Sequence, residues 1–166
     1  SLLLPLTHIA AVNVIVRSME LGTTPIDLRD FVGEFPKANY TAIVPTQLFR
    51  ALNGDQRLLN HLRSTKAVLV GGAALSERLR NQAELAEIKV ITTYGMTETC
   101  GGCIYDGMPL EGVQVEIRNE QICIKGPVLA SSIPLNDGWF ETTDIGEFNN
   151  DHLVVIGRSD DVIISG

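Results

Sequence analysis

The first part of the chain alternates between amphipathic stretches and short apolar runs. Apolar residues at helical spacing predict a helix over residues 7–21, with Thr7 as its cap and Gly22 at its end. The predicted apolar face of this helix consists of Ile9, Val12, Val16, Met19 and Leu21. Such a face predicts that the helix packs against a sheet or another helix.

Strands and helices then follow one another up to residue 95. Four apolar runs read as strands: 24–28, 40–45, 66–72 and 89–95. The segments between them read as helices: a weak one over 29–38 that Pro36 cuts short, one or two over 46–63 with a break at Asn53-Gly54, and one that Ser76 caps and that runs to about Glu87. This alternation predicts an α/β fold with a parallel βαβ layer.

The pattern changes after about residue 105. Residues 112–127 alternate by twos around Asn119-Glu120, and residues 146–158 do so around Asn149-Asn150-Asp151, which predicts two hairpins. A further strand is expected over 161–165, and no helix is evident between 106 and 166. The second part is therefore expected to be an antiparallel β-barrel-like module.

Composition and charge narrow the classes of function. The formal net charge of −7 over 166 residues argues against general nucleic-acid binding, which needs a basic face. No run of 18 apolar residues exists, so no membrane span is expected. The three cysteines are an odd number, which favours a reducing, cytoplasmic location over secretion.

Two of the cysteines, Cys100 and Cys103, have the CxxC spacing of redox and zinc sites. A tetrahedral zinc site needs four ligands, and the sequence has no second CxxC and no HxxxH. The sequence CGGC is also a poor start for the helix that a redox motif usually opens. We therefore interpret this segment as small residues packed near a pocket.

The loops at the carboxyl ends of parallel strands form the ligand crevice of such a sheet. In VITTYGMTET, Tyr94 offers an aromatic face for a base, Thr97 a hydroxyl for a phosphate, and Glu98 a carboxylate for magnesium. In VLVGGAALS, a Gly-Gly turn lets backbone approach a ligand closely. Other roles remain open from the residues alone: packing for Tyr94, capping for Thr97 and a surface acid for Glu98.

Two polar residues of the β-rich part are further candidates. Asp144 follows Thr142-Thr143, and Arg158 ends the second predicted hairpin. An acid can accept both hydroxyls of a ribose, and an arginine can bind a hydroxyl or a phosphate oxygen. The alternatives are a turn residue and a solvated charge. Two histidines, His61 and His152, are expected on solvated faces.

The order of these segments changes the interpretation. The chain resembles the adenylate-forming superfamily of acyl-CoA synthetases, luciferases and peptide-synthetase adenylation domains in four motifs, which are YGMTET, GPVLA, DGWFETTDIG and GRSDDVIISG. A fifth segment, LPLTHIA (4–10), is similar to the acyl-pocket motif of that superfamily. The segments PLTHIAAVNVIVRSMELGT, YTAIVPTQL and VLVGGAAL look most like the o-succinylbenzoate–CoA ligases of menaquinone synthesis. The resemblance implies that residues 1–105 are an α/β subdomain of a large domain, 106–158 a β-rich subdomain, and 159–166 a hinge and the start of a further domain.

The resemblance also implies a role for each candidate. Tyr94, with Gly95 and Met96, would hold the adenine, Thr97 would touch the α-phosphate, and Glu98 would hold magnesium. The remaining assignments are the following: Asp144 and Arg158 for the ribose, Gly71, Gly72 and Ala73 for the adenine and acyl side, His8 at the acyl pocket near the path of the thiol, and Asp160 as the hinge. Thr97, Glu98 and His8 would thus be the catalytic residues.

The implied activity is that of an ATP-dependent ligase that adenylates a small carboxylate, here o-succinylbenzoate, with Mg²⁺, and transfers the acyl group to coenzyme A. Another acyl- or aryl-CoA synthetase and a non-catalytic nucleotide-binding module on the same scaffold remain alternatives. The sequence departs from the family in three respects. Thr143 stands where the family has a glycine, and neither the phosphate loop that ends in lysine nor the C-terminal lysine occurs. The chain is therefore expected to be an internal piece of an enzyme and inactive alone.

Overall fold

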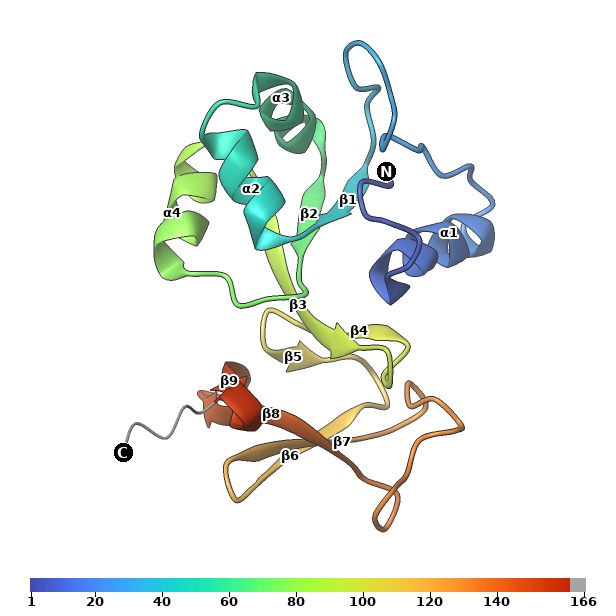
Figure 1. Cartoon of the computed structure of the whole chain (residues 1–166), viewed down its shortest axis with the longest axis vertical. Coiled ribbons are helices and arrows are strands. Elements are labelled where there is room, and N and C mark those ends of the chain that lie inside the picture. Colours follow the sequence, from blue (N-terminus) through green and yellow to red (C-terminus); the bar gives the residue numbers. More distant parts are fainter. Residues whose placement is uncertain (162–166) are drawn as a thin grey trace. The chain divides into compact units, whose positions relative to one another are not determined.

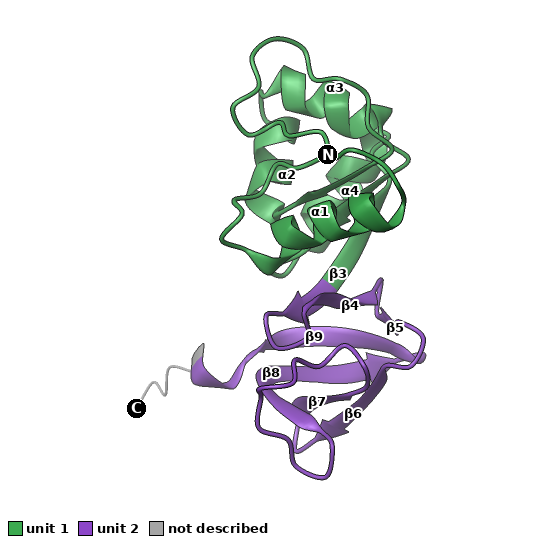
Figure 2. Ribbon diagram, turned by 90° about the vertical axis from the view of Figure 1, so that its right-hand side faces the viewer, with its two compact units in different colours: residues 1–93 green, residues 94–166 purple. Residues whose placement is uncertain are grey.

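The computed structural model describes residues 1–161 of the chain. These residues form two compact units: unit 1 comprises residues 1–93, and unit 2 begins at Tyr94 (Figure 2). The predicted subdomain boundary near residue 105 stays a prediction, and the predicted strand over 161–165 falls almost wholly outside the described residues. Within the described part, no helix is long and apolar enough to cross a membrane.

Unit 1 is built on parallel strands. The strands β1 (Tyr40–Ile43), β2 (Ala67–Val70) and β3 (Val90–Met96), whose last residues belong to unit 2, pair in that order. The helices α2 (Pro45–Leu52), α3 (Gln56–Ser64) and α4 (Glu77–Leu85) lie on one face, and α1 (Ile9–Glu20) lies on the other (Figure 1). The predicted α/β layer is confirmed.

Successive side chains of β1 point to opposite faces of the sheet. Ile43 joins the main core, which it shares with α2, α3 and α4 through Leu48, Leu58, Leu62 and Leu79. Ala42 and Val44 instead pack against the smaller cluster of Leu2, Leu4 and Ala11 on the side of α1. The apolar run of β1 is therefore continuous because both of its faces are covered.

The helix starts follow from local chemistry. Pro45 occupies the first turn of α2, where its missing N–H costs nothing. Asn53-Gly54 ends α2, and the Asp55 carboxylate then caps α3 by accepting a hydrogen bond from the Leu58 N–H at 3.0 Å. The Ser76 hydroxyl caps α4 in the same way at Leu79. The predicted break and the predicted Ser76 cap are confirmed.

Two elements predicted between residues 24 and 38 are wrong. The expected strand over 24–28 is only an isolated bridge, in which Asp27 pairs with Leu2, and no helix forms over 29–38. Pro36 and Gly33, the latter with φ +91°, interrupt this segment, so too few consecutive residues remain for a helix. The connection to β1 is an irregular loop.

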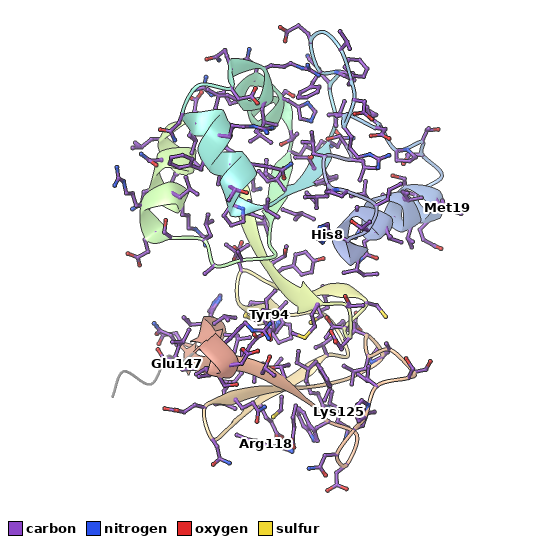
Figure 3. All side chains as sticks on the ribbon, viewed as in Figure 1. His8, Met19, Tyr94, Arg118, Lys125 and Glu147 are labelled. Carbon is purple, nitrogen blue, oxygen red and sulfur yellow. The ribbon has the colours of Figure 1, made fainter. Side chains whose placement is uncertain are left out.

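The predicted apolar face of α1 is also wrong. The helix begins at Ile9 with His8 rather than Thr7 at the N-cap, and the small residue Ala11 is its buried one. Val12, Val16 and Met19 are exposed, the last to 72%. Figure 3 shows Met19 at the far end of α1 from His8. Small side chains let the helix lie close to the sheet, so periodicity alone identified the wrong face.

Unit 2 is antiparallel. β4 (Gly101–Tyr105) and β5 (Met108–Pro109) form a short hairpin. β6 (Gln114–Arg118), β7 (Gln121–Lys125), β8 (Phe140–Asn149) and β9 (His152–Arg158) form a four-stranded sheet in sequence order, followed by the 3-10 turn η1 (Ser159–Asp161). The antiparallel module is thus confirmed, as an open sheet rather than a closed barrel among the described strands.

Three two-residue turns shape unit 2. Asn119-Glu120 and Asn150-Asp151 both have positive φ at each residue, as a type I′ hairpin turn requires, and both were expected from the sequence. Asp106-Gly107 makes the third turn, between β4 and β5, and this hairpin was not predicted. An Asp-Gly pair between apolar residues is a strong signal for a hairpin, so the sequence did contain the information that predicts this hairpin.

Candidate functional site

Tyr94 and Asp144, fifty residues apart in the sequence, meet in unit 2. The Tyr94 hydroxyl donates a 2.7 Å hydrogen bond to Oδ2 of Asp144. The Tyr94 ring packs against the core cluster of Cys103, Ile104 and Ile122. Two residues assigned to adenine and ribose are therefore directly connected.

Burial and the Asp144 carboxylate both act on the Tyr94 hydroxyl. Desolvation is the larger cause and the hydrogen bond to Asp144 the second, and together they raise the pKa of Tyr94 far above its usual value of 10.0. The hydroxyl therefore stays protonated and remains a donor to Asp144. This bond fixes one carboxylate oxygen of Asp144.

The backbone around Asp144 is held by a second hydroxyl that the sequence did not single out for a role. Thr142 is buried, and its Oγ1 accepts a 3.0 Å hydrogen bond from the Asp144 N–H. The backbone carbonyl of Thr142 accepts a hydrogen bond from the Gln121 side chain. Thr143, which replaces the family glycine, has no left-handed φ. The substitution is therefore compatible with this backbone.

Arg158 lies opposite Asp144 across the β8–β9 ladder. Its Nε and Nη2 atoms donate to both carboxylate oxygens of Asp160, at 2.7 and 2.6 Å, and this arginine holds the pKa of Asp160 below its usual value. The Ser159 hydroxyl donates to the Thr143 carbonyl at 3.0 Å. The predicted ribose and hinge residues are thus adjacent, and the exposed Arg158 side chain bonds to Asp160.

Gly95 is required by packing. A Cβ there would lie 2.7 Å from the Cα of Gly102 and would collide with the Gly101 carbonyl. β4 therefore passes directly against the end of β3, and any side chain at residue 95 would push the two apart. After Met96 the chain turns over residues 97–100, which places Thr97 on the surface and leaves Glu98 half-buried.

Thr99 was missed by the sequence reasoning, although it stands within the YGMTET motif. It is 2% exposed, accepts a 2.9 Å hydrogen bond from the Met96 N–H, and donates to the Gly101 carbonyl at 2.7 Å. A threonine inside a tight turn is a known signal for a side-chain–backbone bond of this kind.

The Gly-Gly turn of unit 1 follows β2 at its carboxyl end, as expected. A Cβ on Gly71 would lie 2.9 Å from the Thr93 carbonyl oxygen, and Gly72 has φ +79°, so both positions need glycine. Ala73 is exposed. The turn thus places bare backbone at the edge of the sheet where ligands of α/β folds bind.

The three histidines differ in environment. His8 is exposed at the N-cap of α1, and its side chain makes no capping bond. His152 is exposed, as expected, but the expectation for His61 was wrong, since it is 3% exposed. The His61 ring packs edge-on against Phe35 and lies 2.9 Å from the Ser1 hydroxyl, and burial lowers its pKa. It is part of the unit 1 interior.

The two CxxC cysteines lie in different surroundings. Cys103 is fully buried in the unit 2 core, where desolvation raises the pKa of its thiol, while Cys100 is exposed. A raised thiol pKa disfavours the thiolate that metal binding or nucleophilic attack requires. Cys103 therefore acts as a small core residue.

Magnesium in nucleotide sites is often bound by one or two carboxylates together with the substrate's phosphates. The half-buried Glu98 carboxylate fits this type of site. No group of three or more His, Cys, Asp or Glu side chains within residues 1–161 is arranged as a metal cage.

Comparisons with known proteins identify the family. A family profile described as "AMP-binding enzyme" matches residues 2–131, which is most of the chain and includes the Gly-Gly turn and Tyr94–Glu98. The chain belongs to the AMP-binding enzyme family. The predicted superfamily membership is confirmed.

Two curated relatives are similar over nearly all of the chain. A probable 2-succinylbenzoate–CoA ligase of Mycobacterium tuberculosis is 37% identical over 99% of the chain, and the 2-succinylbenzoate–CoA ligase of Escherichia coli is 31% identical over 98%. The chain spans only 49% and 39% of their respective lengths.

Solved structures give the same result for the fold. A variant of Escherichia coli MenE with bound OSB-AMS is 29% identical, with a TM-score of 0.84 over 98% of this chain and 40% of that one. The o-succinylbenzoate coenzyme A synthetase of Bacillus subtilis, in complex with ATP and a magnesium ion, has a TM-score of 0.81 over 99% of this chain and 42% of that one. At 23% identity, the second likeness concerns the fold alone.

Proposed function

We propose that the whole protein is an ATP-dependent acid–thiol ligase that adenylates o-succinylbenzoate and transfers the acyl group to coenzyme A. The observation that carries this proposal is the 37% identity over 99% of the chain to a probable 2-succinylbenzoate–CoA ligase. The proposal includes a cytoplasmic location, and its partners are a small carboxylate, ATP and coenzyme A, without nucleic acid.

The reaction has two steps. A carboxylate oxygen of the acid attacks the α-phosphorus of ATP, the bond to the β-phosphate oxygen breaks, and pyrophosphate leaves. The sulfur of coenzyme A then attacks the acyl carbonyl carbon, loses its proton, and AMP leaves. Such transfers depend on positioning and on charge stabilisation more than on a protein nucleophile.

Unit 2 carries the residues that we assign to the nucleotide. Tyr94 stacks on the adenine next to the backbone of Gly95 and Met96, and Asp144 accepts the ribose hydroxyls with Arg158 beside it. The Tyr94–Asp144 hydrogen bond supports this assignment, because it fixes a carboxylate at the hydroxyl end of the tyrosine ring. Thr97 donates to the α-phosphate. Bound magnesium, held by Glu98, would neutralise charge on the phosphates.

Unit 1 carries the residues that we assign to the acyl substrate. Gly71, Gly72 and Ala73 present bare backbone to the adenine and the acyl group, and His8 lies at the acyl pocket near the path of the thiol. The missing capping bond of His8 supports this assignment, because the ring is not used to hold the helix start. Asp160 is the proposed hinge.

The test is pyrophosphate release by the whole protein with ATP, magnesium and o-succinylbenzoate, compared with benzoate and with a fatty acid. We expect release with o-succinylbenzoate and thioester formation once coenzyme A is added. Preference for another acid would favour a different acyl- or aryl-CoA synthetase. AMP binding without release for any acid would favour the non-catalytic nucleotide-binding module. The 166-residue chain alone serves as a control that we expect to be inactive.

A further inference from the structure

Thr99 connects both ends of the turn that carries Thr97 and Glu98. Its Oγ1 accepts the Met96 N–H at 2.9 Å, at the last residue of β3, and lies 2.7 Å from the Gly101 carbonyl oxygen, at the first residue of β4. The hydroxyl has one proton, and the Gly101 carbonyl is a nearer acceptor than the Met96 carbonyl at 3.1 Å. One buried side chain therefore closes the loop between two strands.

The backbone of the turn is held at two further points. The Cys100 N–H donates to the Thr97 carbonyl at 3.0 Å, and the Ala130 N–H donates to the Glu98 carbonyl at 2.8 Å. Thr97 is exposed and Glu98 is half-buried, while the next residue, Thr99, is 2% exposed. Burial thus increases from Thr97 to Thr99, and the most buried of the three side chains makes the bonds.

We propose that Thr99 is a positioning residue, whose hydroxyl fixes the turn so that Thr97 and Glu98 reach the phosphates in the geometry that adenylation needs. The proposal rests on the proposed function. Thr99 touches neither substrate nor metal, and it acts through the backbone of its two neighbours. A displacement of about 1 Å in such a group can lower a rate on the order of 10²-fold.

The substitutions separate the hydroxyl from the volume of the side chain. Thr99→Val removes the hydroxyl and keeps the shape, and Thr99→Ser keeps the hydroxyl. Thr41→Val is the matched control, because Thr41 is equally buried and also bonds to backbone, but lies in β1 of unit 1. All three are made in the whole protein.

We expect Thr99→Val to slow single-turnover adenylate formation by about 10- to 100-fold. AMP affinity should stay within about threefold, since Tyr94 and Asp144 are untouched. Thr99→Ser should recover the rate, and Thr41→Val should keep it. A Thr99→Val protein with the wild-type rate would overturn the proposal. The proposal would also be overturned if Thr99→Val lost rate and AMP affinity equally and Thr41→Val did the same, because such losses indicate general destabilisation.

A second measurement keeps this test separate from the proposed function. Wild-type protein that forms no adenylate with any acid would refute the ligase activity. Thr99 is then judged by calorimetry of ATP with and without magnesium. We expect Thr99→Val to lose most of the affinity that magnesium adds while its AMP affinity is kept. An unchanged magnesium effect would refute the positioning role.

Discussion

At the scale of single residues, the hydrogen bond between Tyr94 and Asp144 gives a prediction for stability against pH. The raised pKa of Tyr94 means that the folded protein keeps a proton that the unfolded chain loses above pH 10. This contribution is fully present below pH 10 and declines above it, by about 1.4 kcal/mol per pH unit. We expect Tyr94→Phe to remove this extra loss of the free energy of unfolding.

Urea denaturation of the chain at pH 9 and near pH 11 measures this effect, with Tyr40→Phe as the control, because Tyr40 is exposed in unit 1. If wild type and Tyr94→Phe lost the same stability between the two pH values, the buried, protonated state of Tyr94 would be contradicted. At pH 9, Tyr94→Phe should also be less stable, because a hydrogen bond to a carboxylate contributes about 1.5–3 kcal/mol.

Glu98 is the second prediction at this scale. In the whole protein, Glu98→Gln should slow magnesium-dependent adenylate formation far more than it weakens AMP binding, since only the phosphate side loses its metal ligand. Each tenfold loss of rate corresponds to about 1.4 kcal/mol of transition-state stabilisation. Single-turnover kinetics and AMP calorimetry give the two numbers. Unchanged single-turnover kinetics would remove Glu98 from the metal site.

At the scale of elements, the start of α1 contrasts with the start of α4. His8 makes no capping bond, whereas the Ser76 hydroxyl caps α4. We expect His8→Ser to raise the free energy of unfolding by about 1 kcal/mol, and Ser76→Ala to lower it by a similar amount. Urea denaturation of the chain measures both changes.

The His8→Ser variant also tests whether His8 has a role in the reaction. In the whole protein, His8→Ser should lower the rate of thioester formation although it stabilises the helix, as is common where a site residue is locally unfavourable. Full activity together with higher stability would show that His8 has no part in the acyl pocket.

At the scale of the whole molecule, Asp160 in η1 is the proposed hinge between two half-reactions. Asp160→Pro fixes φ near −65°, so a rotation about this residue would be restricted. We expect thioester formation to fail while adenylation largely survives. Asp160→Ala is the control, because it removes the ion pair with Arg158 but leaves the backbone free. Equal loss of both half-reactions in Asp160→Pro would argue against a hinge.

The sequence by itself determined the elements whose signals are local. Asn53-Gly54, Ser76 and the Asn119-Glu120 turn each act within a few residues, and the predicted break, cap and hairpin all occur. The order of the motifs likewise identified the family. These signals are readable because turn and cap preferences depend on a residue's own conformation and its nearest neighbours.

Only the tertiary structure decided which surfaces are covered and which distant groups meet. The periodicity of α1 indicated Val12, Val16 and Met19, but the sheet accommodates the small Ala11 instead. His61 is buried against Phe35, and Tyr94 finds Asp144 fifty residues away. Thr99 bonds to two strands because β3 ends just before it and β4 begins just after it. Packing and long-range hydrogen bonds depend on how the chain returns on itself, which no local pattern specifies.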